Sequence, residues 1–250
     1  MKAIILAAGM GSRMQHLTEK LPKCMLKFGG KTLLERQIEA LISCGITDIA
    51  VVKGYKGEKI NYPGLKYYMN DNYENNNILN SLFYAEEEMD DEVIISYSDI
   101  LYEKQVVERL FESTKDISIV VDIEWREYYK NRKDHPISEA ENIIFDAENK
   151  IIEIGKILTD KHDVQGEFIG MMKLTRRGTD IFKRNFHRAK ELFWGKPFVR
   201  AATFEKAYLT DMLQDLVFMG IDVHCVIIER GWREIDTVED YENTLNIFEK

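Results

Sequence analysis

A glycine-containing stretch near the N-terminus carries residue types that bind phosphate groups. Residues 6–13 read Leu-Ala-Ala-Gly-Met-Gly-Ser-Arg and directly follow a short apolar run. Glycines let the backbone pass close to a phosphate chain, where successive N–H groups form an anion-binding nest. Arg13 adds a planar guanidinium for phosphate oxygens. The stretch is not a P-loop, because the G-x-x-x-x-G-K-[ST] pattern is absent, and alone it also fits an ordinary tight turn between a strand and a helix.

A second cation and two carboxylates follow at positions that suit the same site. Lys23 stands in a Pro-Lys pair ten residues past Arg13, a spacing that can return the lysine to the phosphate site. Asp99 lies two residues after the apolar run Glu92–Tyr97. A carboxylate at the carboxyl end of a parallel strand lies over the ligand crevice. Asp236 is a further carboxylate, in Glu-Ile-Asp-Thr. The ordinary alternatives are a turn residue for Asp99 and a helix cap for Asp236.

These motifs resemble the N-terminal signature of the sugar-phosphate nucleotidyltransferase superfamily, LAAGxGxR followed by PKxL. LAAGMGSRM and LPKCM carry the resemblance, the stretch around Asp236 is similar to the family ending W-x-E-I-D-T-x-E-D, and the order of elements agrees along the whole chain. The resemblance implies that Arg13 and Lys23 are catalytic and neutralise charge on the α-phosphate and the departing pyrophosphate. It also implies Mg²⁺ on Asp99 and Asp236, and two protein oxygens with phosphate and water as further ligands suit that ion. The glycine-containing loop would hold the nucleotide through Leu6, Ala7, Ala8, Gly9, Met10, Gly11, Ser12 and Arg13.

The resemblance extends to the acceptor side. Lys156, after Ile154-Gly155, is similar to the superfamily lysine that contacts the acceptor's phosphate, and Glu167 lies in a Gly-Glu-Phe-Ile-Gly strand near the family's acceptor pocket. The segment from Asp122 to Glu141 is rich in charges and aromatics and is a candidate substrate loop. In it, Trp125 could form part of an aromatic cage for a quaternary ammonium. Arg132 and its charged neighbours better suit a zwitterionic or amide-bearing acceptor, and a solvated loop is the ordinary alternative.

Within the superfamily, the chain looks most like the phosphocholine cytidylyltransferase branch, whose relatives also act on 2-aminoethylphosphonate and other small phosphorylated amines or amides. The short chain, the run Asn75–Leu82 and the Ser-Asp-Ile strand end carry this resemblance. It implies CTP as the nucleotide and a product used in surface-polysaccharide or phosphonate biosynthesis. Asparagine offers both donors and acceptors, which suits cytosine, so the nucleotide site would also include Asn77, Asn80, Ser81 and Ser98. A helix-capping loop is the alternative for residues 75–77.

The expected chemistry needs no general base. A phosphate or phosphonate acceptor is largely dianionic at neutral pH and is already a nucleophile. Catalysis then reduces to positioning and charge neutralisation around Arg13, Lys23 and Lys156. Three alternatives remain. The first is an enzyme that makes a UDP-, dTDP- or GDP-sugar. The second is a catalytically silent nucleotide-binding regulatory module, which the joint presence of these cations and both aspartates disfavours. The third is a GT-A glycosyltransferase, which would want a D-x-D motif that neither 70–72 nor 98–100 supplies.

Alternating elements must position these residues. We expect strands at 2–6, 48–52, 65–69, 92–97 and 117–122, and helices at 33–43, 79–88 and 105–113. Strands at 143–145, 151–154 and 168–174 would form an added antiparallel layer, before helices at 176–186 and 205–219, a strand at 223–228 and a helix at 238–248. This order predicts a single α/β domain over 1–250, Rossmann-like (GT-A type), with a mostly parallel central sheet and helices on both faces. Residues 1–121 would form the nucleotide-binding half and 122–250 the acceptor-binding half.

Composition limits the partners. The chain has 250 residues, a net charge of −9 and a pI near 5.2, which argues against nucleic acid as a partner. No apolar run approaches the length of about 20 residues that a membrane span needs. The three cysteines fit no zinc pattern and are expected to be reduced thiols. The sequence therefore indicates a cytoplasmic enzyme, and it leaves a homodimer open.

Overall fold

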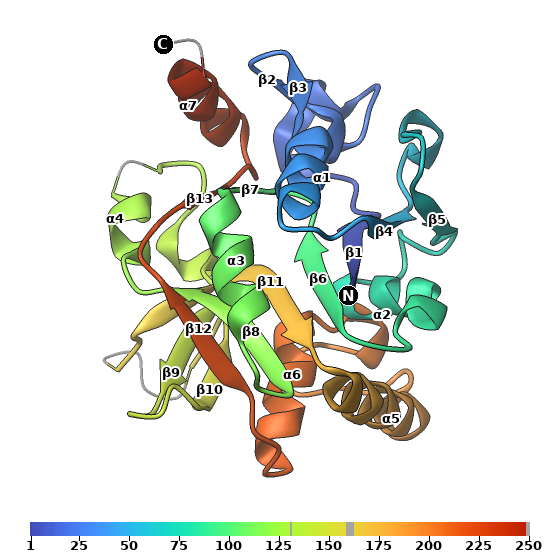
Figure 1. Ribbon diagram of the computed structural model, residues 1–250, viewed down its shortest axis with the longest axis vertical. Helices are drawn as coiled ribbons and strands as arrows, with labels where there is room; N and C mark the ends of the chain where they lie inside the picture. The colour runs from blue at the N-terminus through green and yellow to red at the C-terminus, as the bar shows by residue number, and fades with distance from the viewer. Residues whose placement is uncertain (131, 159–162, 249–250) are drawn as a thin grey trace.

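The computed structural model describes residues 1–130, 132–158 and 163–248, and it is built around a nine-stranded sheet (Figure 1). Four neighbouring strands run parallel in the order β6 (Val93–Tyr97), β1 (Lys2–Ala7), β4 (Asp48–Lys53) and β5 (Lys66–Met69). Because they are parallel, their carboxyl ends meet at one edge of the sheet. That edge carries the glycine-containing loop after β1 and Asp99 after β6.

Strand β11 (Gly166–Leu174) runs against its neighbours and joins the two halves of the sheet. It pairs antiparallel with β6 on one side and with β8 (Ile117–Asp122) on the other, and β8 pairs in parallel with β12 (His224–Ile228). Beyond its N-terminal end, β9 (Asn142–Phe145) and β10 (Ile151–Gly155) extend the sheet antiparallel. The predicted antiparallel strands therefore form, but they belong to the central sheet instead of a separate layer: β11 lies inside it, and β9 and β10 extend it.

Helices cover both faces, as predicted, because the buried strands alternate their side chains between two apolar clusters. Ala3 and Ile5 of β1 pack in a cluster with α1 (Leu33–Ser43) and α3 (Lys104–Glu112). Ile4 and Leu6 face the other cluster, with α2 (Ile78–Leu82), α5 (Arg176–Phe193) and α6 (Leu209–Phe218). The rigid sheet between these layers fixes the carboxyl ends of its strands.

Several elements differ from the sequence-based expectation. The helix predicted at 79–88 divides into α2 and the 3-10 helix η4 (Phe83–Glu88), with non-helical backbone at Ala85. The helix predicted at 205–219 divides into η6 (Phe204–Lys206) and α6, because Tyr208 adopts an extended backbone and forms a capping box with Asp211. The helix predicted at 176–186 continues to Phe193. The candidate substrate loop contains α4 (Trp125–Tyr129) and η5 (Ile137–Glu139).

Two short strands outside the main sheet bring distant segments together. Strand β7 (Ile100–Tyr102) pairs antiparallel with β13 (Trp232–Glu234), and the N–H of Ile235 donates to the carbonyl of Asp99 at 2.8 Å. Helix α7 (Val238–Phe248) then packs near the N-terminal 3-10 helices η1 (Ser12–Thr18) and η2 (Lys23–Met25) and the hairpin β2 (Lys27–Phe28) and β3 (Lys31–Thr32), through a cluster that includes Met14, Phe28 and Ile235. The two aspartates, 137 positions apart in the sequence, thereby lie side by side.

Over the described residues, no helix is both long enough and apolar enough to cross a membrane.

Candidate active site

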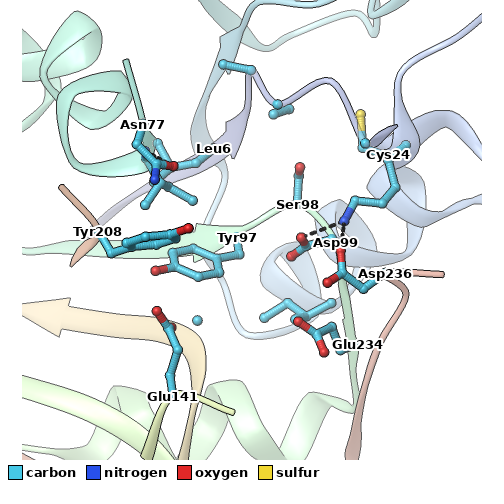
Figure 2. A pocket seen from close by; sticks show the side chains of 18 of the residues that line it. Leu6, Cys24, Asn77, Tyr97, Ser98, Asp99, Glu141, Tyr208, Glu234 and Asp236 are labelled. Carbon is cyan, nitrogen blue, oxygen red and sulfur yellow. Dashed lines mark hydrogen bonds and ion pairs between the residues drawn. The ribbon is translucent and has the colours of Figure 1, made fainter. Parts of the chain in front are cut away.

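A cleft of about 320 Å³ opens at the carboxyl edge of the parallel strands, within the range of small-molecule sites. Its walls come from the loop after β1, the end of β6, the middle of β11, the segment leading to β9, and β13 (Figure 2). The two halves of the chain thus face each other across it.

The glycine-containing loop packs directly against the segment that carries Lys23. Gly11 has φ +61, and a Cβ there would lie 3.2 Å from the Cβ of Lys23, so glycine allows both the left-handed backbone and the close approach. The hydroxyl of Thr18 donates to the carbonyl of Gly11 at 3.1 Å and ties the end of η1 back to the loop. This packing explains how a lysine ten residues past Arg13 returns to the same site.

Lys23 bridges the two predicted metal ligands. Its ammonium lies 2.9 Å from Oδ2 of Asp99 and 2.6 Å from Oδ1 of Asp236, two carboxylates that lie side by side in Figure 2. Arg13 forms a further ion pair with Asp236. Burial alone would lower the pKa of Lys23, but the two carboxylates raise it above its usual value. Burial would raise the pKa of Asp236, yet Lys23, a hydrogen bond with His135 and the charge of Arg13 hold it well below its usual range. Both groups are therefore ionised at neutral pH.

The same carboxylates fit a divalent cation. Oδ1 of Asp99 is buried and has no hydrogen-bond partner among the described residues, whereas Oδ2 of Asp236 is paired with Arg13 and lies 3.3 Å from Nδ1 of His135. Carboxylate oxygens are the ligands that hard divalent ions prefer. The donor set thus fits the metal site that the sequence predicts.

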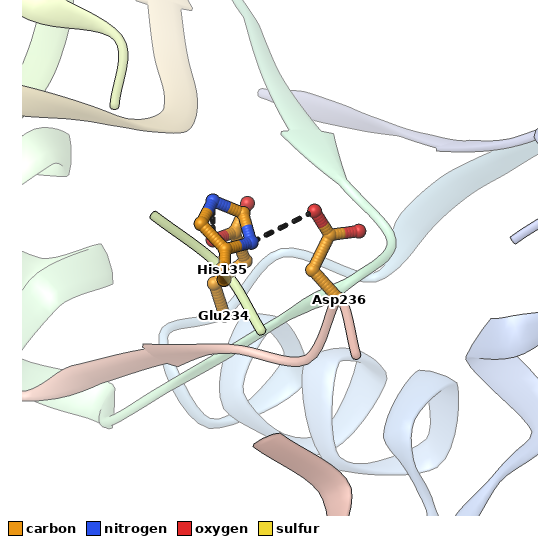
Figure 3. A group of neighbouring side chains, drawn as sticks. All are labelled: His135, Glu234 and Asp236. Atoms are coloured by element: carbon orange, nitrogen blue, oxygen red, sulfur yellow. Dashed lines mark ion pairs between the residues drawn. The ribbon is translucent and has the colours of Figure 1, made fainter. Parts of the chain in front are cut away.

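A further group of ionisable side chains lies around Asp236, and Figure 3 shows two of them, His135 and Glu234. His135 Nδ1 lies 3.3 Å from Oδ2 of Asp236, and its Nε2 lies 3.6 Å from Oε2 of Glu234. Arg132 donates to both oxygens of Asp240 at 2.8 and 2.9 Å and to Glu234 at 3.0 Å. Asp240 in turn accepts from the N–H of Asp236 at 3.1 Å. This network holds the backbone of Asp236 from the acceptor-side segment.

The other end of the cleft has one lysine and several carboxylates. Lys156 pairs with Glu139 at 2.7 Å and lies over the ring of Tyr208, 5.1 Å from its centroid. Glu167 accepts a hydrogen bond from the hydroxyl of Tyr129, and Glu141 accepts one from Thr210 at 3.2 Å. Burial raises the pKa of Glu141 to about 7, and burial together with the charge of Glu234 raises the pKa of Glu167.

Most of the predicted site residues line this one cleft. They are Leu6, Ala7, Ala8, Gly9, Gly11, Ser12, Arg13, Lys23, Asn77, Ser81, Ser98, Asp99, Lys156, Glu167 and Asp236. Met10 is exposed on the loop and is not among the lining residues.

The polar side chains predicted to read the base are engaged by the protein itself. Asn77 caps α2 by accepting from the N–H of Ile78, and its amide donates to the carbonyl of Lys206 at 3.1 Å. Asn80 lies behind the lining and donates to the carbonyl of Phe204 at 2.9 Å, and Ser81 accepts from Asn70 at 2.8 Å. Asn77 and Asn80 thus hold the turn around η6 against α2, and Ser81 joins α2 to the segment after β5. The capping alternative describes Asn77.

Two predicted acceptor residues lie outside the cleft. Trp125 is 3% exposed and packs with Tyr129 and Leu158 in a satellite apolar cluster. Its burial in this cluster keeps it from contributing to a cage around a ligand. Arg132 is buried in the ion-pair network described above. The structure places both where they support the acceptor-side segment.

Sequence reasoning missed some of the lining residues, but not the charged ones of the candidate substrate loop. That loop reaches the cleft through His135, Glu139 and Glu141, charged neighbours of Arg132 in the sequence, and not through Trp125. Tyr97 and Tyr208 also line it, and Tyr208 arrives from the break between η6 and α6. Gly170 has φ +85, and a Cβ there would lie 2.4 Å from the Tyr97 ring, so that glycine positions the tyrosine. In the sequence, the two glycines of the Gly-Glu-Phe-Ile-Gly stretch in β11 were the one indication of this close contact.

Comparison with known proteins agrees with this geometry. Residues 3–151 match the family model described as MobA-like NTP transferase domain. The chain is 32% identical to the CTP:phosphoglutamine cytidylyltransferase of Campylobacter jejuni, over 97% of this chain and 98% of that protein. It is 28% identical to the 2-aminoethylphosphonate cytidylyltransferase of Lancefieldella rimae, over 77% of this chain and 76% of that protein.

A solved structure supports the fold. The CTP:phosphocholine cytidylyltransferase of Streptococcus pneumoniae superposes with a TM-score of 0.72 at 24% identity, covering 98% of each chain. At this identity the similarity shows the fold alone, and it confirms the Rossmann-like architecture expected from the sequence.

Proposed function

The chain belongs to the family of MobA-like NTP transferase domains, and we propose that it transfers CMP from CTP to a small phosphorylated or phosphonylated metabolite. Pyrophosphate is the second product. The two relatives named above are cytidylyltransferases for a phosphorylated and a phosphonylated compound, which supports both the reaction and the nucleotide.

The observation that carries the proposal is the gathering of charge in one cleft. Arg13 and Lys23 lie at the glycine-containing loop, Lys156 lies on the acceptor side, and the two metal carboxylates lie beside Lys23. A nucleoside triphosphate and a phosphate dianion repel one another, so the cleft must bring cations to both. The chain as a whole has a net charge of −9, so these cations are a local feature of an acidic protein.

The reaction follows from this placement. Lys156 binds the acceptor's phosphate and leaves Glu139 as it does so. One anionic oxygen of that phosphate attacks the α-phosphorus in line with the departing bond. The new oxygen–phosphorus bond forms as the bond to the β-phosphate oxygen breaks, and pyrophosphate leaves with the electron pair. Arg13 and Lys23 neutralise the negative charge on the α-phosphate and pyrophosphate, and no proton has to move.

Asp99 and Asp236 would hold the metal, and we propose Mg²⁺ as the ion. Bound there, it would neutralise phosphate charge. We further propose that the enzyme acts in the cytoplasm, that it supplies a surface-polysaccharide or phosphonate pathway, and that a homodimer is its candidate assembly.

A nucleotidyltransferase that makes a UDP-, dTDP- or GDP-sugar is the second candidate, because the fold is shared. Both relatives named above are cytidylyltransferases, which favours the first candidate over this second one. A silent regulatory module is disfavoured, because the cations and metal carboxylates are all present and meet in one cleft.

A matrix of substrates tests the proposal. Pyrophosphate release is measured with each of CTP, UTP, GTP and ATP against phosphoethanolamine, phosphocholine, 2-aminoethylphosphonate, phosphorylated amides and hexose 1-phosphates. We expect turnover with CTP and a non-sugar acceptor. Turnover confined to a hexose 1-phosphate with another nucleotide would support the second candidate. The exposed variant Lys150→Ala, at a turn far from the cleft, is the matched control for the lysine variants below.

A further inference from the structure

The acceptor end of the cleft is built for a positive charge. Four carboxylates line it or border it, from Glu139, Glu141, Glu167 and Glu234. Apart from Arg13 and Lys23 on the nucleotide side, Lys156 is the one lysine or arginine among the described lining residues, and Glu139 already pairs with it. Glu234 is held by Arg132, so an acceptor that brought only a phosphate would leave Glu141 and Glu167 without a cationic partner among the described residues, in a partly desolvated site.

Two of the groups at this end have no hydrogen-bond partner among the described residues. Glu167 is 3% exposed, and while its Oε1 accepts from Tyr129, its Oε2 is buried and no described residue donates to it. The hydroxyl of Tyr97 is likewise buried, with no partner in the described part of the chain. Both residues line the cleft. An unpaired buried carboxylate oxygen is costly, and a donor from a ligand would remove that cost.

Glu141 completes the group. Its carboxylate points toward the rings of Tyr97 and Tyr208 (Figure 2) and accepts one hydrogen bond, from Thr210. Glu141 and Lys156 line the same end of the cleft. A small molecule with its phosphate on Lys156 can therefore place a second group beside Glu141.

We propose that Glu141 and Glu167, with the hydroxyl of Tyr97, bind a protonated primary amine of the acceptor, so that the enzyme selects phosphorylated primary amines over quaternary ammonium compounds. This inference rests on the proposed function and names the acceptor class of the same site. A primary ammonium brings a charge and three N–H donors, which match the carboxylates and the unpaired oxygens. A trimethylammonium group brings the same charge and no donor. It would also want an open aromatic face, and of the two rings toward which Glu141 points, that of Tyr208 already has Lys156 over it.

The test is a graded series at constant charge. Phosphoethanolamine and its N-methyl, N,N-dimethyl and N,N,N-trimethyl forms carry three, two, one and no N–H donors on the ammonium, and ethyl phosphate is the reference that has the phosphate without an ammonium. Isothermal titration calorimetry measures their affinities for the whole protein with Mg²⁺ and a CTP analogue whose α,β-bridge is methylene. We expect the affinity to fall along the series, by about 10- to 100-fold from the primary amine to phosphocholine, because each step removes a donor from a buried acceptor.

Substitutions of the two glutamates test whether they produce the preference for a primary amine. Glu141→Gln and Glu167→Gln should each weaken phosphoethanolamine about 10-fold or more and leave ethyl phosphate unchanged, whereas Glu148→Gln on an exposed turn should change neither. Equal affinities along the series, including no measurable binding of any member, or tighter binding with added methyl groups, would overturn the proposal. The wild-type series decides this even if a variant does not fold. If the substrate matrix finds no CTP-dependent transfer while the series still shows the amine preference, the proposed function fails and the subsite stands.

Discussion

The ammonium of Lys23 lies 2.6 Å from Oδ1 of Asp236, and the same nitrogen lies 2.9 Å from Oδ2 of Asp99. One lysine therefore holds together the two carboxylates that would bind the metal. The contact joins the nucleotide-side loop to the segment before α7. The first two predictions follow from it.

Lys23→Met should reduce turnover by at least about 10³-fold, or about 4 kcal/mol of transition-state stabilisation, because the charge nearest the departing pyrophosphate is lost. It should also lower the melting temperature in the absence of metal, since Asp99 and Asp236 then repel one another in a buried site. Mg²⁺ should raise the melting temperature of this variant more than that of the wild type, as measured by differential scanning fluorimetry. Equal shifts in both proteins would contradict a shared carboxylate site, and Lys150→Ala should behave as wild type.

Asp99→Asn should reduce turnover by about 10²- to 10³-fold with the fold intact, because an amide is a weaker ligand for a divalent ion and a weaker partner for Lys23. The binding of Mn²⁺, measured by electron paramagnetic resonance of the free ion in the presence of CTP, should weaken in parallel. The control is Asp90→Asn, at an exposed position remote from the lining residues. Unchanged Mn²⁺ affinity in Asp99→Asn would place the metal elsewhere.

Glu141→Gln should change how stability depends on pH. The folded protein raises the pKa of Glu141 to about 7 from a usual 4.5, so between these values the folded state binds more protons than the unfolded state. Wild-type stability therefore loses a contribution as the pH rises through this window, and the glutamine variant does not. We expect the variant to gain about 1 to 3 kcal/mol relative to wild type between pH 5 and pH 8, since one pKa unit corresponds to about 1.4 kcal/mol. Urea denaturation at both pH values measures it, and parallel pH curves would argue against a buried carboxylate.

Arg132→Met should destabilise the protein by about 3 to 5 kcal/mol, because it leaves Asp240 buried without its bidentate partner and Glu234 without one of its cations. Arg132→Lys should recover little of this lost stability, since an ammonium cannot reproduce the bidentate contact of the guanidinium with Asp240. The control is Arg177→Met, whose side chain is 79% exposed and pairs with Asp116. Equilibrium unfolding in urea measures all three. A loss below about 1 kcal/mol in Arg132→Met would mean that the network does not hold the segment around Asp236.

The parallel core was accessible from the sequence because its signals are local. The apolar run before Gly9 and the amphipathic pattern of residues 33–43 each report burial within a few residues, and α1 and α7 begin and end where expected. The breaks in the predicted helices at Ala85 and Tyr208 could not be predicted from the sequence. They depend on tertiary contacts and on a side-chain cap, which compete with helical propensity.

The nucleotide side of the site followed from motif spacing, whereas the acceptor side did not. Arg13 and Lys23 lie in one compact motif pair, so their meeting could be predicted. Glu141 and Tyr208 come from irregular segments with no motif, and only the folded chain brings them to the cleft. Trp125 shows the converse, because an aromatic residue in a charged loop looks available to a ligand but is buried by its neighbours.

The most direct test follows the α-phosphorus of CTP. The wild-type protein is incubated with Mg²⁺, CTP and a phosphorylated amine, and ³¹P nuclear magnetic resonance records where each phosphorus goes. We expect the α-phosphorus to appear in a diphosphate linked to the acceptor, with one pyrophosphate for each product and neither signal with Lys23→Met. Release of inorganic phosphate, or of CMP with no diphosphate product, would contradict a cleft that joins two phosphates.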